Sequence, residues 1–73
     1  MERLRDAVIR VKDGEWLCRA PVVFAWSNGL LLELTPGVVY RTGVRCESVD
    51  VAVMLDDWLA TGRLPLNVSI RFR

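Results

Sequence analysis

Histidine is absent from this chain of 73 residues, and cysteine occurs only twice, as Cys18 and Cys46. Without histidine the chain lacks the residue that most often serves as general base and as metal ligand. The two cysteines lie far apart in the sequence and do not form the C-x-x-C pair that is typical of zinc sites. We therefore expect neither a bound metal nor a cofactor.

Other groups that could support catalysis are few. Serine occurs three times, and each serine has a structural role in the predicted fold: Ser27 in a turn, Ser48 at a helix start and Ser69 on a strand surface. The neighbouring carboxylates Asp56 and Asp57 fall in a predicted helix, where consecutive side chains point about 100° apart and do not converge on one substrate. The sequence thus predicts no catalytic residue and no enzyme activity.

A long hydrophobic segment is also missing. No apolar run exceeds five residues, whereas a membrane-spanning helix needs about 20. The first six residues are mostly charged and precede no hydrophobic region, unlike a secretory signal peptide. We expect a cytoplasmic protein, in which the two cysteines stay reduced as free, buried residues.

Neither sign of charge dominates the composition. Ten basic and nine acidic residues leave a net charge of +1, and Lys12 is the only lysine. Hydrophobic residues make up 52% of the chain and charged residues 26%, which is typical of a folded protein. At this length we expect a single domain over residues 1–73 that is only marginally stable as a monomer.

Residues 7–20 predict a β-hairpin. Asp13-Gly14 is a favoured dipeptide of two-residue turns, and it would place Lys12 opposite Glu15. In that register one face of the hairpin is apolar, and it carries Ala7, Ile9, Val11, Trp16, Cys18 and Ala20. Pro21 cannot donate a hydrogen bond to a neighbouring strand, so we expect one long strand over 16–26 that bends near this proline.

The apolar stretch 22–41 predicts three antiparallel strands joined by two turns. Asn-Gly at 28–29 favours a second two-residue turn, which would place Phe24 opposite Glu33. Pro-Gly at 36–37 suits a type II turn, which would place Tyr40 opposite the same Glu33. Gly43 then marks a bulge in the third strand or its end.

Residues 48–61 predict a helix. Ser48 suits its N-terminal cap and Gly62 its end. One apolar stripe is formed by Val51, Ala52, Leu55, Trp58 and Leu59. Apolar residues over 49–55 also alternate with the period of a strand, so an extended segment is the alternative. After Pro65, residues 66–72 alternate between apolar and polar side chains and predict the last strand.

These elements predict an α+β fold. We expect a small, curled, antiparallel β-sheet of five to six strands, barrel-like in shape, with one helix at about 48–61 before the last strand. The sheet is apolar on both faces, and a single helix can cover only one of them. The alternative is that curling of the sheet and packing of the helix bury both faces within a monomer.

An uncovered apolar face predicts a surface for a protein partner. The candidate partner-binding residues are those that the predicted registers place on the outer face: Val23, Leu30, Leu32, Leu34 and Val39. Burial of this face between two copies would make the protein a homodimer. We expect a non-enzymatic protein–protein interaction module, of the size of an accessory regulator or inhibitor carried by a phage or mobile element.

Single-stranded nucleic-acid binding by a small β-barrel is the alternative function. Arginines interleaved with aromatic residues on a curled sheet are typical of such proteins. The candidate contacts are Arg10, Arg19, Arg41, Arg71 and Arg73. The near-neutral charge argues against this alternative, because binding to a phosphate backbone depends on an excess of basic residues.

Overall fold

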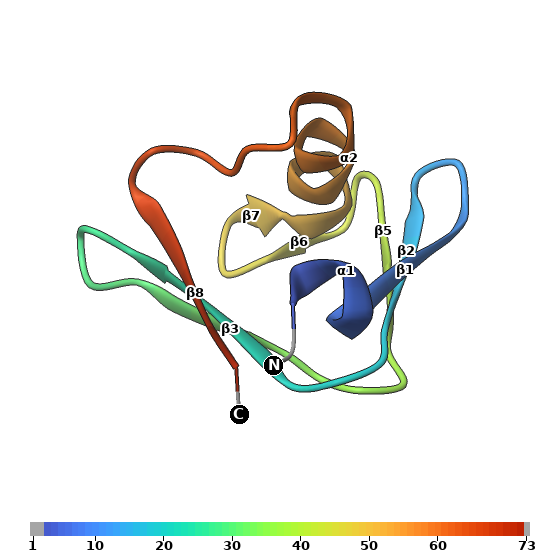
Figure 1. The fold of residues 1–73 in the computed structure, drawn as a ribbon, viewed down its shortest axis with the longest axis horizontal. Helices are drawn as coiled ribbons and strands as arrows, with labels where there is room; N and C mark the ends of the chain where they lie inside the picture. The colour runs from blue at the N-terminus through green and yellow to red at the C-terminus, as the bar shows by residue number, and fades with distance from the viewer. Residues whose placement is uncertain (1–2, 73) are drawn as a thin grey trace.

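Two three-stranded antiparallel sheets stand on either side of one main helix in the computed structural model, which describes residues 3–72 (Figure 1). One sheet has the order β1-β2-β5 and the other the order β4-β3-β8, and β6 pairs with β7 in a small two-stranded ribbon. The elements are α1 (Leu4–Ala7), β1 (Val8–Lys12), β2 (Glu15–Cys18), β3 (Val22–Trp26), β4 (Leu31–Leu34), β5 (Val39–Arg41), β6 (Arg45–Cys46), β7 (Val49–Asp50), α2 (Val51–Thr61) and β8 (Val68–Phe72).

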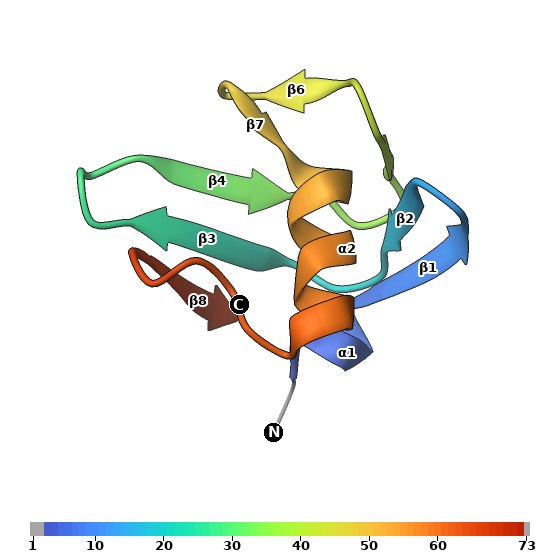
Figure 2. The same ribbon diagram turned by 90° about the horizontal axis from the view of Figure 1, so that it is seen from above.

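The predicted α+β class is confirmed, with antiparallel sheets and one main helix before the last strand. The predicted closure into a barrel is wrong, because the chain divides its strands between two separate sheets, which Figure 2 shows on opposite sides of α2. The segments 19–21 and 35–38 carry the chain from one sheet to the other. Consequently 16–26 is not one bent strand but two strands, β2 and β3, in different sheets.

The hairpin of β1 and β2 has the predicted turn but not the predicted register. Lys12 does lie opposite Glu15, and a bulge at Val11 then shifts the pairing by one residue, so that Arg10 lies opposite Trp16. Because side chains alternate between the faces of a strand, this extra residue inverts β1. Val8 rather than Ile9 is buried, and Ile9 and Val11 are 43% and 48% exposed.

The hairpin of β3 and β4 also differs from its predicted register by one residue. The Trp26 N–H donates to the Leu30 carbonyl at 2.8 Å, so the loop contains three residues rather than two. The Asn28 side chain accepts the Leu30 N–H at 3.0 Å, and Gly29 has a φ of +94°, which favours glycine. Phe24 therefore lies opposite Leu32, not opposite Glu33.

The predicted pairing of the second and third strands of 22–41 is wrong. β5 pairs with β2 instead of β4, so that Tyr40 lies opposite Trp16. The connection from β4 turns at Gly37, whose φ is +89° and whose N–H donates to the Cys18 carbonyl. The Tyr40 hydroxyl accepts the Thr35 N–H at 2.9 Å, which fastens β5 to this connection.

The structure confirms the predicted helix and not the extended segment that was its alternative. The helix α2 begins at Val51, three residues later than predicted. Ser48 has a φ of +68° and does not cap it; the carboxylate of Asp50 does, by accepting the Val53 N–H at 3.2 Å. The predicted end is confirmed, because Gly62 has a φ of +73° and donates its N–H to the Trp58 carbonyl.

The core lies between the two sheets, where α1 and α2 fill the space (Figure 1). Its largest fully buried side chains come from both sheets and from α2: Phe24, Leu34, Leu55, Val22, Val51 and Cys18. Within residues 3–72 no helix is long and apolar enough to cross a membrane.

Candidate interaction grooves

A groove rich in tryptophan lies at the C-terminal end of α2, and we call it the tryptophan groove. It occupies about 200 Å³ between α1, β1, β2 and α2, and a further hollow of about 430 Å³ shares three of its lining residues. The lining side chains that give the groove its charge and its aromatic and apolar surface are Arg5, Arg10, Trp16, Trp58 and Leu59. The groove brings together residues that are separated by more than half of the chain.

Hydrogen bonds and ion pairs order the polar side of this groove. The buried Trp16 donates its indole N–H to Oδ1 of Asp56 at 2.8 Å. Nε of Arg10 lies 3.7 Å from the same oxygen, and Nη2 of Arg10 lies 2.7 Å from Oδ1 of Asp13. The Trp16 and Trp58 rings are tilted by 57° with centroids 6.2 Å apart, a favourable arrangement for aromatic pairs. The polar side thus carries both signs of charge.

The apolar side of the tryptophan groove continues the core. Ala52, Leu55 and Leu59 fall on one stripe of α2, because residues three and four apart share a helix face. Ala52 and Leu55 are fully buried, whereas Leu59, one turn further along, is 54% exposed. The stripe therefore extends past the point where the sheets cover it, and it leaves an open end of the core at the surface.

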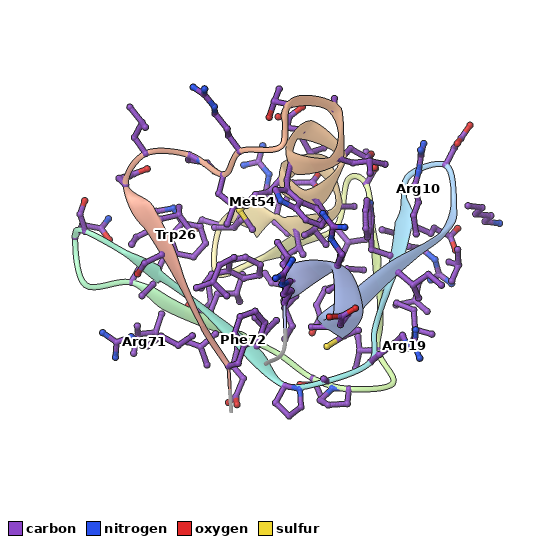
Figure 3. The ribbon with its side chains drawn as sticks, in the orientation of Figure 1. Arg10, Arg19, Trp26, Met54, Arg71 and Phe72 are labelled. Atoms are coloured by element: carbon purple, nitrogen blue, oxygen red, sulfur yellow. The ribbon has the colours of Figure 1, made fainter. Side chains whose placement is uncertain are left out.

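A second groove lies near the N-terminal end of α2, and we call it the acidic groove. It occupies about 340 Å³ and has Trp26, Val49, Val53 and Met54 among its apolar lining residues. Figure 3 shows Trp26 and Met54 close to each other. The ionisable lining residues within 3–72 are the carboxylates of Asp50 and Asp57. The Asp50 carboxylate is already engaged, since Oδ2 accepts the Gly43 N–H at 2.8 Å and Oδ1 caps α2.

The five predicted partner-binding residues do not share an exposed face. Val23, Leu32 and Leu34 are buried, and Leu30 and Val39 are half-buried. For Leu32 and Leu34 the physical reason is the three-residue loop, which turns them towards Phe24 and Val22 and turns Leu31 outwards. The expectation that Leu32 and Leu34 lie on the outer face is therefore wrong.

Val39 belongs to an apolar row that crosses the sheet of β1, β2 and β5. It lies opposite Leu17, and Leu17 lies opposite Ile9, so the three form one cross-strand row. Trp16 bonds to Asp56 of α2 and Tyr40 packs against the core, so the row, which occupies the other face, lies on the side of this sheet away from the core. Two ion pairs border the row, because Oε2 of Glu15 lies 3.3 Å from Nζ of Lys12 and 3.6 Å from Nε of Arg41.

The arginines of the nucleic-acid alternative are not gathered on one face. Arg10 lies on the face of its sheet that contains Trp16, because the bulge inverts β1. Figure 3 shows Arg71 on the opposite side of the molecule from Arg10 and Arg19. Arg10 and Arg41 each lie in an ion pair with a carboxylate. Arg73 lies outside the described residues.

The cysteines and carboxylates offer few reactive arrangements. Both cysteines are free; Cys18 is buried as predicted and Cys46 is half-buried. Burial raises the pKa of the Cys18 thiol, because a thiolate would lose its hydration there. Among residues 3–72 no three His, Cys, Asp or Glu side chains group in a way that could hold a metal ion.

Sequence reasoning missed both grooves. The contact of Trp16 with Asp56 spans 40 residues and leaves no local signal in the sequence. Leu59 was part of the predicted helix stripe. That it is exposed follows only from where the two sheets end, because they cover Ala52 and Leu55 but not Leu59. Comparison with protein-family models, curated proteins and solved structures finds no match to this chain.

Proposed function

We propose that the protein is a small, non-enzymatic protein–protein interaction module that acts as a homodimer. The observation that supports this proposal is the open end of the core at the tryptophan groove, where Leu59 is 54% exposed beside the half-buried Trp58. Tryptophan is enriched among the residues that dominate binding energy at protein interfaces. A surface of this kind, continuous with the core, fits association with a second folded chain.

Burial of Leu59 would provide a measurable part of the association energy. Full burial of a leucine side chain stabilises by about 1.5 to 3 kcal/mol, so covering its exposed half contributes about 1 kcal/mol per copy. In a two-fold dimer the same residues contribute twice, once from each chain. The half-buried Trp58 adds aromatic area to the same interface.

The charges around the tryptophan groove are compatible with a second copy. Arg5 and Arg10 line the groove, and Nε of Arg10 lies 3.7 Å from Oδ1 of the partly exposed Asp56, so both signs of charge occur at its polar edge. Two identical surfaces that carry both signs can pair opposite charges across a two-fold axis, whereas surfaces of a single sign would repel each other. This arrangement supports self-association at the tryptophan groove rather than at the acidic groove.

The biological role that we propose is that of an accessory regulator or inhibitor of a larger complex, as phages and mobile elements carry, in the cytoplasm. Its support is the small size of the chain, its two free cysteines and the open groove. The predicted absence of catalysis belongs to the same proposal.

Light scattering at increasing protein concentration tests the homodimer. We expect a dimer for the unmodified chain at about 50 μM, a concentration at which a micromolar complex is largely formed. Leu59→Glu should give a folded monomer, because it places a charge in the interface. The matched control is Leu31→Glu, which changes an outward residue of β4 that is 61% exposed and lies outside the groove, and it should stay dimeric. A monomeric unmodified chain, or equal effects of the two variants, would contradict the proposal.

A further inference from the structure

We infer that the acidic groove is the binding site for a partner protein, and that it takes a cationic, amphipathic segment. The segment would place apolar side chains against Trp26 and Met54 and a lysine or arginine beside Asp57. This inference rests on the proposed function, because it names the kind of partner that the interaction module recognises.

The apolar part of the groove offers contacts that a segment can bury. Val53 is 41% exposed, and it lines the groove together with the half-buried Trp26 and Val49. A volume of about 340 Å³ lies within the range of about 300 to 1,000 Å³ for small-molecule pockets. It is therefore large enough to take a few side chains of a docking segment. In an amphipathic helix such side chains lie on one face and serve as apolar anchors in the groove.

The charge of the groove selects the polar side chains of that segment. Asp50 and Asp57 both line the groove, and no lysine or arginine among residues 3–72 does so. Asp50 is held by two backbone N–H groups, whereas Asp57 is exposed and its side chain makes no ion pair with a described residue. A positive side chain of a partner would therefore find an available carboxylate at Asp57.

The same charges argue against two other occupants. A second copy would bring carboxylates of one acidic groove towards those of another, and like charges in contact are unfavourable. A nucleic acid would bring phosphates towards Asp57 and meet the same repulsion. A cationic segment of a different protein is the occupant that fits both the apolar lining and the charge.

The test uses three synthetic peptides and the indole N–H resonance of Trp26 in the full chain. The first peptide has about 18 residues of leucine and lysine, with the leucines on one helical face. The second replaces every lysine with glutamate, and the third replaces every leucine with serine. We expect the Leu–Lys peptide to shift the Trp26 resonance and to bind at least about tenfold more tightly than either of the others, because it alone satisfies both the apolar lining and the charge.

Variants locate the binding in the acidic groove. Asp57→Lys should weaken the Leu–Lys peptide at least about fivefold, since an ion pair is replaced by a repulsion. Asp57→Asn should weaken it in the same direction but less. The matched control is Asp6→Asn, which removes the same charge from an exposed position of α1, and it should change the affinity less than about twofold.

Three outcomes would overturn the inference: no shift of the Trp26 resonance, equal binding of the Leu–Glu peptide, or equal effects of Asp57→Asn and Asp6→Asn. Leu59→Glu separates this inference from the homodimer, because Leu59 lies in the other groove. A dimer without peptide binding refutes only the inference. A monomer that still binds the Leu–Lys peptide refutes only the dimer.

Discussion

Replacing Asp56 with alanine removes the acceptor that ties α2 to β2. The Trp16 indole N–H, which Asp56 accepts at 2.8 Å, belongs to a side chain only 3% exposed. Alanine offers no acceptor in place of the lost carboxylate. The variant therefore leaves a buried donor without a partner, which is more costly than the loss of an ordinary surface hydrogen bond.

The expected loss of stability is about 2 kcal/mol. An unsatisfied buried donor costs about 1 to 3 kcal/mol. The ion pair of Asp56 with Arg10 at 3.7 Å adds at most about 0.5 kcal/mol, because both side chains are a third or more exposed. Alanine is the better helix former, which offsets the loss by about 0.5 kcal/mol. For a domain of this size, 2 kcal/mol corresponds to a decrease in Tm of about 8 to 16 °C.

Urea unfolding followed by circular dichroism measures this loss, with Asp57→Ala as the matched control. Asp57 is the next residue of the same helix and is exposed, so its replacement makes the same change in charge and helix propensity. We expect it to change the free energy of unfolding by less than about 0.5 kcal/mol. A double-mutant cycle with Trp16→Phe should give a coupling of about 1 to 2 kcal/mol. Equal stabilities of the Asp56→Ala and Asp57→Ala variants would refute the reasoning.

Three further variants or conditions test the core, the buried thiol and the nucleic-acid alternative. Leu34→Ala should lower the free energy of unfolding by about 2 to 5 kcal/mol in urea, because this side chain is fully buried; a loss below 1 kcal/mol, typical of surface positions, would place it outside the core. Since burial raises the pKa of Cys18, the folded chain holds that proton more tightly than the unfolded chain, so stability is complete below pH about 8.5 and falls as pH rises above it. Cys18→Ala should remove this part of the pH dependence. An unchanged pH dependence of stability in this variant would contradict its assignment to the Cys18 thiol. We expect no sub-micromolar binding of a single-stranded oligonucleotide at physiological salt by fluorescence anisotropy; salt-sensitive binding that Arg71→Ala weakens would favour the alternative function.

Local signals predicted several elements because those signals depend on backbone conformation alone. Gly14 and Gly62 both have positive φ, and they mark the first turn and the end of α2 where the sequence indicates them. The alternation of 66–72 likewise predicted β8 to within two residues at its start. In each case a residue type suits one conformation, so neighbours in the sequence carry the information.

The faces of β1 and β4 could not be predicted, because one extra residue inverts each of them. The bulge at Val11 and the third loop residue before Leu30 each shift a register by one. Both alternatives for β1 place apolar residues inward, Val8 in one register and Ile9 in the other. The contacts that decide between them, such as Trp16 with Asp56, come from α2 and lie 40 residues away.

Mixed-label NMR tests the proposed dimer interface most directly. A sample that combines isotope-labelled and unlabelled chains reports only contacts between copies. Dimerisation at the tryptophan groove predicts intermolecular NOEs from the Leu59 methyl groups to the Trp58 ring of the other chain. Intermolecular NOEs confined to the row of Ile9, Leu17 and Val39, or none at a concentration where light scattering shows a dimer, would contradict it.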